Sequence, residues 1–313
     1  MKGIRFIPED TKLNFMGVRF LAFVLSALLL LGSVGLIAQN GLNFGIDFTG
    51  GTIIEVRTPE MPDLTDLRRT LNGINLGAVS IQEFGAPDDL LIRMGEQEGG
   101  PEGQRAAIDS VKTTLDGLYD EPVDYRRVEF VGPQVGKELK LQGLYAVLFS
   151  LAGILAYIWF RFEWQFGVAA IIALAHDSLA TIGLFALTQM EFNLSTVAAI
   201  LTIAGYSIND TVVVFDRIRE NLRKYKKMSL KDLFNMSLNQ TLTRTLMTSV
   251  TTMIALLALY YLGGEVIRGF IYALIFGVAI GTYSSIFVAS AVLLYMNVRR
   301  SGEVAQPQNA QEA

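Results

Sequence analysis

The 313-residue sequence contains no cysteine and only one histidine, and these shortages exclude several kinds of site. Without cysteine the chain can form neither a disulfide nor a thiolate metal site. The sequence also lacks a Gly-x-x-x-x-Gly-Lys-Ser/Thr loop, which excludes a P-loop ATPase. The net charge of −4 gives no support to nucleic-acid binding. We therefore expect no enzyme activity, no bound cofactor and no nucleic-acid partner.

Charged residues are scarce, at 18%, whereas hydrophobic residues make up 51% of the chain and the mean hydropathy is +0.39. This is too apolar for an ordinary soluble protein. Apolar runs of about 18 residues or more, long enough to cross a bilayer, occur at 16–38, 139–160, 166–188, 246–262 and 269–296. The run at 192–215 is weaker because Gly205, Ser207, Asn209 and Asp210 interrupt it. The first run is too long for a signal peptide, so the sequence predicts six transmembrane helices.

Basic residues near the span ends predict the orientation, because short loops rich in lysine and arginine stay in the cytoplasm. Eight of them follow the fourth span: Arg217, Arg219, Arg223, Lys224, Lys226, Lys227, Lys231 and Arg244. Both termini are therefore expected in the cytoplasm. The expected organisation is a cytoplasmic N-terminus (1–15), a first span (16–38), an outer domain (39–138), a five-helix bundle (139–296) with a basic loop at about 216–244, and a disordered cytoplasmic tail (297–313).

The outer segment alternates between strand-like and helix-like patterns. The predicted elements are a strand at 52–57, a helix capped by Asp63 or Thr65 and ending near Gly73, strands at 78–84 and 90–94 around a turn at 86–89, a helix at 108–118 and a strand at 123–131. The β-α-β-β-α-β order predicts a ferredoxin-like α+β domain. Because this segment lacks histidine and cysteine, we expect it to bind or move something rather than to catalyse a reaction.

Three charged residues fall inside the predicted spans, where each costs roughly 2.5–3.5 kcal/mol to insert. They are Asp177, Asp210 and Arg244, and the lone His176 adjoins Asp177. Asp210 lies roughly 27 Å into the fourth span at 1.5 Å per residue, and Arg244 enters the fifth span from the same side. The sequence therefore makes an ion pair between Asp210 and Arg244 plausible, with Arg244 holding Asp210 ionised until its position changes.

Polar residues share helix faces around this pair. Thr248, Thr251 and Thr252 lie on the predicted face of Arg244, and Tyr206 and Ser207 lie on that of Asp210. Such facing stripes are compatible with a hydrated path on which a carboxylate takes up and releases protons.

Structural interpretations of the same residues stay open. The Asp210–Arg244 pair could be purely structural, and a threonine stripe often serves helix packing. His176 and Asp177 could relay protons, bond neighbouring helices or contact a partner subunit. Gly205 could permit close packing or a local bend.

Five stretches of the sequence resemble the SecF proteins: Phe44-Gly45-Ile46-Asp47-Phe48-Thr49-Gly50-Gly51 after the first span, residues 205–221, residues 241–245, Val131-Gly132-Pro133 and Ala175-His176-Asp177. These stretches extend over nearly the whole chain.

The resemblance implies a polytopic α-helical protein of the resistance-nodulation-division transporter class, with six transmembrane helices and a periplasmic domain between the first two. It also implies residence in the bacterial inner membrane, a heterodimer with SecD, and association with the SecYEG channel and YajC. The implied activity is use of the proton motive force to promote export of preproteins. Asp210 and Arg244 would then transfer protons, His176 and Asp177 would be secondary candidates, and Gly45, Asp47, Gly50, Gly51 and Gly205 would be structural motif residues.

Three alternative functions differ from this interpretation in what they require of the sequence. An intramembrane aspartyl protease could use Asp177 and Asp210, but its Gly-x-Gly-Asp motif is missing, since Ser207 and Asn209 occupy the places before Asp210. A proton-coupled efflux transporter for small molecules would need larger outer domains. A non-conducting scaffold of the translocon predicts that Asp210 is replaceable.

Overall fold

The computed structural model describes residues 11–74, 76–77, 79–84, 86–264, 267–296 and 298. The chain divides into two compact units, with the division falling inside two long helices. The sheet unit consists of Asn43–Leu148 and Glu191–Val197, and the other described residues form the helical unit. Residues 1–10 of the predicted N-terminal segment, and the predicted tail from 297 onwards apart from Val298, lie outside the described residues.

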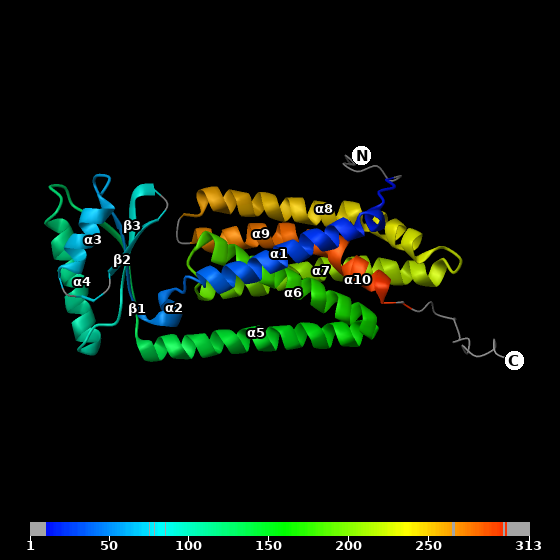
Figure 1. Ribbon diagram of the computed structural model, residues 1–313, viewed down its shortest axis with the longest axis horizontal. Coiled ribbons are helices and arrows are strands. Elements are labelled where there is room, and N and C mark those ends of the chain that lie inside the picture. The colour runs from blue at the N-terminus through cyan, green and yellow to red at the C-terminus, as the bar shows by residue number, and fades with distance from the viewer. Residues whose placement is uncertain are drawn as a thin grey trace, which may run out of the picture. The chain divides into compact units, whose positions relative to one another are not determined.

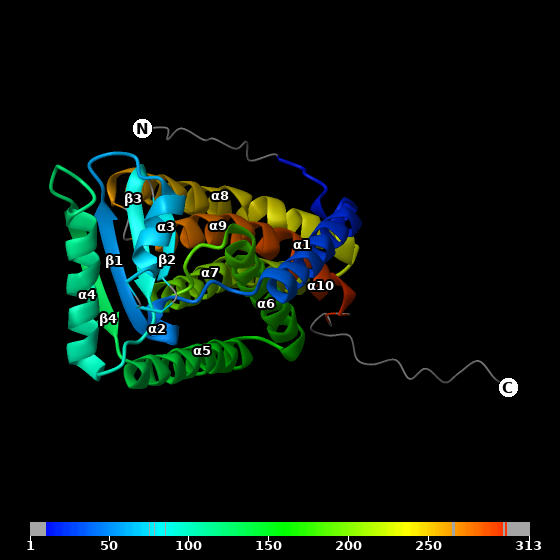
Figure 2. The ribbon, with the colours of Figure 1, turned by 60° about the vertical axis from the view of Figure 1, so that its left-hand side comes forward.

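The sheet unit has the predicted β-α-β-β-α-β order. Its elements are β1 (Gly51–Arg57), α3 (Leu64–Asn72), β2 (Val79–Phe84), β3 (Ala86–Met94), α4 (Gly100–Asp116) and β4 (Asp124–Val131), preceded by the short helix α2 (Ile46–Thr49). The strands lie in the order β2-β3-β1-β4, and every neighbouring pair is antiparallel. Helices α3 and α4 cover the same face of this sheet (Figures 1 and 2).

Strand alternation explains the core of this unit, because successive side chains point to opposite faces of a sheet. Ile54 and Ile92 are fully buried against Leu71 of α3 and Leu115 of α4. Ile53 instead packs on the opposite face, in a second cluster that includes the motif residue Ile46 and Leu91.

The predicted cap of α3 is confirmed. The Asp63 carboxylate accepts hydrogen bonds from the backbone N–H groups of Thr65 (2.8 Å) and Asp66 (3.3 Å). These two bonds hold the pKa of Asp63 below its ordinary value. A polar residue before an amphipathic stretch was therefore a sufficient signal for the start of this helix.

The predicted turn at 86–89 is wrong, because β3 already begins at Ala86. Asp89 pairs with Arg57 across β1, and its buried carboxylate accepts hydrogen bonds from Arg57 (2.7 and 2.6 Å) and Arg126 (3.1 Å). The sequence Ala-Pro-Asp-Asp is typical of a turn, but here partners far along the chain neutralise a strand aspartate.

The six predicted membrane helices are confirmed by helices long and apolar enough to cross a bilayer. They are α1 (Arg19–Asn40), α5 (Pro133–Arg161), α6 (Trp164–Thr188), α7 (Leu194–Lys224), α8 (Leu230–Leu262) and α9 (Arg268–Ser284), which continues through the π-helix η3 (Ser285–Ala289) into α10 (Ser290–Tyr295). A short 3-10 helix, η1 (Phe15–Gly17), precedes α1, and α1 packs against α6.

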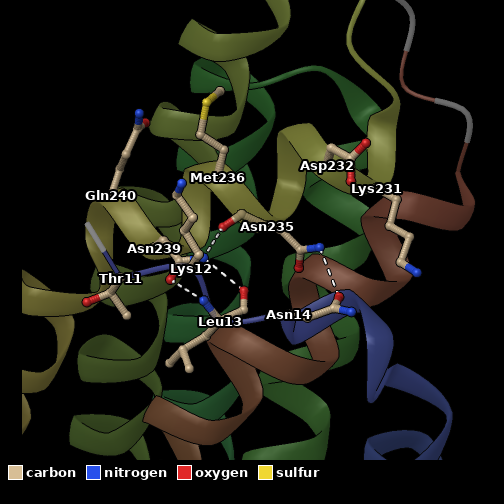
Figure 3. A pocket seen from close by; sticks show the side chains of 10 residues that line it. All are labelled: Thr11, Lys12, Leu13, Asn14, Lys231, Asp232, Asn235, Met236, Asn239 and Gln240. Carbon is tan, nitrogen blue, oxygen red and sulfur yellow. Dashed lines mark hydrogen bonds between the residues drawn. The ribbon is translucent and has the colours of Figure 1, made fainter. Parts of the chain in front are cut away.

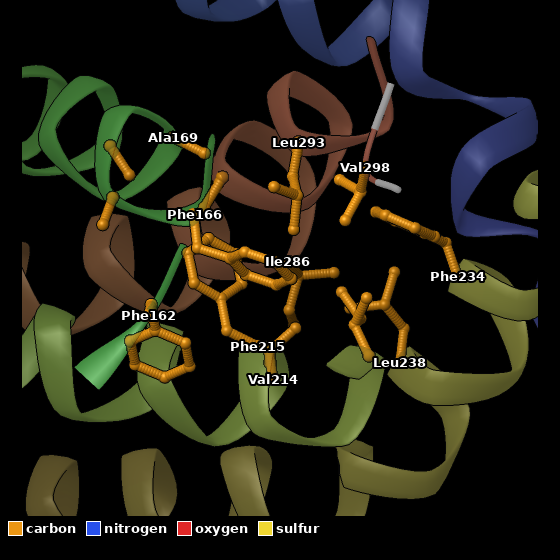
Figure 4. Packing of buried hydrophobic residues seen from close by; sticks show 14 of the residues in the cluster. Phe162, Phe166, Ala169, Val214, Phe215, Phe234, Leu238, Ile286, Leu293 and Val298 are labelled. Carbon is orange, nitrogen blue, oxygen red and sulfur yellow. The ribbon is translucent and has the colours of Figure 1, made fainter. Parts of the chain in front are cut away.

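The expected basic loop at 216–244 is mostly helical, since only residues 225–229 separate α7 from α8. The ends of both helices carry apolar side chains on one face, and these bury in a shared core. Figure 4 shows Phe215 of α7 among Phe162 and Phe166, with Phe234 and Leu238 of α8 in the same cluster. Basic residues occupy the remaining faces of the two helices. The high density of charge therefore led to a wrong prediction of a loop where the chain is helical.

Candidate functional site

Asp210 is a buried carboxylate in the middle of α7, and among the described residues only its Oδ1 has a hydrogen-bond partner. Its Oδ1 accepts a 2.7 Å hydrogen bond from the Thr245 hydroxyl of α8. None of the described residues forms a hydrogen bond with its buried Oδ2, although the Ser285 hydroxyl lies close to the carboxylate. An unpartnered polar atom in an apolar environment is costly, so this oxygen is where a proton or a water molecule would be stabilised.

The ion pair considered for Asp210 and Arg244 is absent from the described part of the chain. Consecutive residues of an α-helix point about 100° apart, and it is Thr245 that faces Asp210. Arg244 is exposed and lies on the wall of a cavity of about 340 Å³ between α7 and α8. The other lining residues are Asn209, Val212, Val213, Asp216, Arg217, Glu220, Gln240 and Thr241.

The inner face of α8 differs from the predicted one. Thr248 and Thr251 are exposed, and their hydroxyls donate to backbone carbonyls of their own helix. Ser249, one turn beyond Thr245, instead accepts a hydrogen bond from the Tyr206 hydroxyl (3.2 Å) and shares one with Thr282 of α9 (2.6 Å). Thr245 and Ser249 thus connect α8 to α7 and α9.

Asp177 of α6 is fully buried and has both oxygens satisfied. The Nδ1 atom of His176 lies 2.9 Å from Oδ1, while the hydroxyls of Ser207 (2.6 Å) and Ser284 (2.7 Å) donate to Oδ2. The Nε2 atom of His176 is buried and has no hydrogen-bond partner in the part of the chain that the structure describes. The structure therefore joins the predicted pair to α7 and α9, and of the two side chains only the Asp177 carboxylate has all its polar atoms hydrogen-bonded.

Side-chain hydroxyl groups connect the residues next to Asp210 with those around Asp177. Ser285, next to Ser284, shares a 2.8 Å hydrogen bond with Thr211, the residue after Asp210. Ser285 begins η3, and the Ser290 hydroxyl donates to its carbonyl oxygen across that π-turn (3.0 Å). Sequence reasoning missed these serines, although three buried serines within one apolar span were an available signal.

The glycines that bring α9 close to α7 are Gly277 and Gly281. A Cβ atom at Gly277 would overlap Ile203, and one at Gly281 would lie 3.1 Å from Cβ of Ser207. Gly205 is different, because a Cβ there would meet nothing within 4 Å. The close packing considered for Gly205 therefore does not occur among the described residues.

Of the predicted motif glycines, Gly45, Gly50 and Gly51 lie in the sheet unit and have conformational or steric reasons, whereas Gly205 lies in the helical unit. Gly50 and Gly51 have φ angles of 73° and 109°, which favour glycine. A side chain at Gly45 would overlap the Glu191 carboxylate. Asp47 of the same motif accepts a 2.9 Å hydrogen bond from the Leu194 backbone N–H, at the first residue of α7.

A pocket of about 570 Å³ lies where the segment before α1 crosses the first turns of α8 (Figure 3). The Asn239 side chain bonds both the N–H and the carbonyl of Leu13, at 3.0 and 2.9 Å. Asn235 accepts from the Met16 N–H (2.8 Å) and donates to Asn14 (3.1 Å). Two asparagines one turn apart thus fasten this segment. No group of residues that could hold a metal ion occurs in the part of the chain that the structure describes.

Comparisons with known proteins agree over most of the chain. A family model described as the C-terminal region of the protein export membrane proteins SecD and SecF matches residues 110–299, and a model of the SecD/SecF GG motif matches 35–58. The chain is 46% identical over 290 residues to a protein translocase subunit SecF of Rickettsia bellii, covering 93% of this chain and 95% of the relative. It is 46% identical over 297 residues to the Rickettsia rickettsii subunit, covering 95% and 96%.

A solved structure has a similar fold. It is the crystal structure of SecDF, described as a translocon-associated membrane protein, from Thermus thermophilus. The TM-score is 0.84 and the identity 38%, over 94% of this chain. The chain spans 40% of the length of that SecDF chain.

Proposed function

The chain belongs to the SecF proteins of the SecD/SecF family, and from this premise we propose that it works with SecD to drive protein export with the proton motive force. In this proposal it lies in the bacterial inner membrane with both termini in the cytoplasm and the sheet unit in the periplasm. Together with SecD it acts on preproteins that pass through the SecYEG channel, with YajC as a further partner. The proton is the coupling ion.

The observation that carries the proposal is the half-satisfied carboxylate of Asp210. Thr245 holds Oδ1 in place, so Oδ2 is presented at a fixed position where a proton can bind and leave. One elementary charge moved through 100 mV releases about 2.3 kcal/mol, enough to shift a two-state equilibrium roughly 50-fold.

Arg244 and the His176–Asp177 pair have different roles in this proposal. The cavity beside Arg244 supplies the proton path next to Asp210, and the guanidinium favours the ionised carboxylate once the helices move. Asp177 is a secondary proton-transfer candidate, because all three of its side-chain partners must rearrange before it changes its protonation.

The exposed face of α8 supports a membrane partner. Arg244, Thr248 and Thr251 are exposed on a helix that is long and apolar enough to cross a membrane. Charged and polar side chains inside a bilayer face protein or water rather than lipid. SecD is the partner we assign to this face.

Asp210→Asn tests the proposal, because asparagine keeps the shape of the side chain but does not titrate. The measurement is export of a slowly secreted preprotein with and without an uncoupler, at matched expression and with SecD co-purification as a check of assembly. We expect the uncoupler-sensitive part of export to disappear, while Asp66→Asn, on the exposed surface of α3, leaves it unchanged. Wild-type export by Asp210→Asn would instead support a non-conducting scaffold.

A further inference from the structure

The segment Asn43–Gly51 makes contacts that the proposed proton chemistry does not use. It runs beside the loop between α6 and α7, within the sheet unit. The Phe192 N–H donates to the Asn43 carbonyl (2.8 Å), and the Gly45 N–H donates to the Phe192 carbonyl (2.9 Å). Phe44 and Phe192 are therefore paired as in a short parallel ladder, and their rings lie edge to face with centroids 5.9 Å apart.

Asp47 adds a contact to α7 itself. Its Oδ2 accepts the 2.9 Å hydrogen bond from Leu194, the first residue of the helix. The local cap is Asn193, whose Oδ1 accepts from the Thr196 N–H (3.1 Å). A helix N-terminus has free N–H groups and a partial positive charge. Asp47 supplies an acceptor and a negative charge from 147 residues away in the sequence.

A third contact ties the same loop to the sheet. Arg93 of β3 forms an ion pair with Glu191 (3.0 Å) and donates to the Asn43 side chain (2.9 Å). Burial raises the pKa of Glu191, and the charge of Arg93 acts in the opposite direction. Gly45 has no side chain because one would occupy the position of the Glu191 carboxylate.

We propose that Asp47 is a positioning residue that fastens the start of α7 to the sheet, so that movement of the helix carrying Asp210 is transmitted to β1. Asp47 is close in sequence to the sheet and is bonded directly to the helix. Asp47 lies four positions before Gly51, where β1 begins, and bonds the first residue of the helix on which Asp210 lies. This inference rests on the proposed function for its biological meaning, but the fastening itself is a property of the contacts.

The first test measures the fastening without using export. Asp47→Ala in the full chain, purified with SecD, is compared with wild type by amide hydrogen exchange of residues 192–197. We expect about fivefold faster exchange, the factor that corresponds to the roughly 1 kcal/mol of a helix cap. Asp47→Asn keeps an acceptor oxygen and should lie between the two. Unchanged exchange in Asp47→Ala overturns the proposal.

The second test asks whether the fastening couples movement. Asp63→Ala is the matched control, because it removes an aspartate cap from α3 in the same unit without touching α7. We expect Asp47→Ala to lose most of the uncoupler-sensitive export and Asp63→Ala to retain it. Equal losses would assign Asp47 to domain stability alone and overturn the coupling.

A covalent replacement completes the design, and the absence of native cysteine makes it specific. Strand neighbours lie about 5 Å apart, within the range of a disulfide, so Phe44→Cys with Phe192→Cys should cross-link on oxidation. In the Asp47→Ala background, oxidation should restore uncoupler-sensitive export and reduction should abolish it. Failure to restore export overturns the proposal. If cells carrying Asp210→Asn export the preprotein normally, the proposed function fails. The exchange difference at 192–197 tests the contact of Asp47 with α7 independently of that result.

Discussion

Replacing Ser207 and Ser284 by alanine, singly and together, tests whether Asp177 is an ionised carboxylate whose charge is stabilised by these two hydroxyl donors. Both hydroxyls donate to the same oxygen, at 2.6 and 2.7 Å, in a site with no exposed surface. A hydrogen bond to a charged group contributes about 1.5–3 kcal/mol to stability. Each single variant should therefore lose about 1.5 kcal/mol, because the second hydroxyl still satisfies the oxygen.

The double variant leaves Oδ2 of Asp177 buried without a donor, which adds about 1–3 kcal/mol of desolvation. We therefore expect a total loss of about 4–6 kcal/mol, which exceeds the sum of the two single losses by about 1–3 kcal/mol. The assay is reversible unfolding in mixed micelles, followed by far-ultraviolet circular dichroism. Thr251→Ala, whose exposed hydroxyl donates to its own helix, should change stability by less than about 0.5 kcal/mol.

Additive losses of about 1 kcal/mol each would refute this reasoning. A protonated Asp177 would donate its own hydrogen, so one serine would accept and neither removal would leave a charge unsolvated. Losses that add within about 0.5 kcal/mol indicate such independent, neutral contacts.

Two further predictions concern a helix contact and a helix cap. Gly277→Ala should destabilise the chain by about 1–3 kcal/mol in the same unfolding assay, because its methyl group overlaps Ile203. Gly205→Ala, whose methyl group meets none of the described residues, should be neutral or stabilising by up to about 1 kcal/mol. Equal effects at both glycines would contradict this prediction. Asp63 has a lowered pKa, so its capping contribution is fully present above the ordinary value of 3.8 and is lost as pH falls through the folded value. Amide exchange of α3 in wild type and Asp63→Ala should accordingly differ at neutral pH and converge in acid; a difference independent of pH would argue against the cap.

Much of the fold could be predicted because its signals are local. Apolar runs predicted six spans, and alternation with capping residues predicted the β-α-β-β-α-β order. The errors came from long-range partners. Asp89 lies in a sequence that is typical of a turn, yet hydrogen bonds from Arg57 and Arg126 stabilise its carboxylate in a strand. The charged ends of α7 and α8 have loop-like composition, yet one apolar face of each is buried.

The sequence identified the aspartates of the candidate site but not their hydrogen-bond partners. Burial of Asp177 and Asp210 follows from their place in apolar spans. Their partners depend on helix rotation, which span assignment does not fix. A rotation of about 100° exchanges Arg244 for Thr245, and this is the difference between the considered ion pair and the observed hydrogen bond. The contacts of Ser284 and Ser285 depend further on the π-turn after α9.

The two asparagines that fasten the segment before α1 impose an order on biogenesis. Leu13 precedes Asn239 by 226 residues, so the ribosome releases the segment long before its binding partner exists. Met16, which is completely buried in the finished protein, must wait in another environment until α8 is made. The first span of this protein is therefore inserted early but anchored late, and nascent chains truncated before α8 should present this segment to proteases and chaperones.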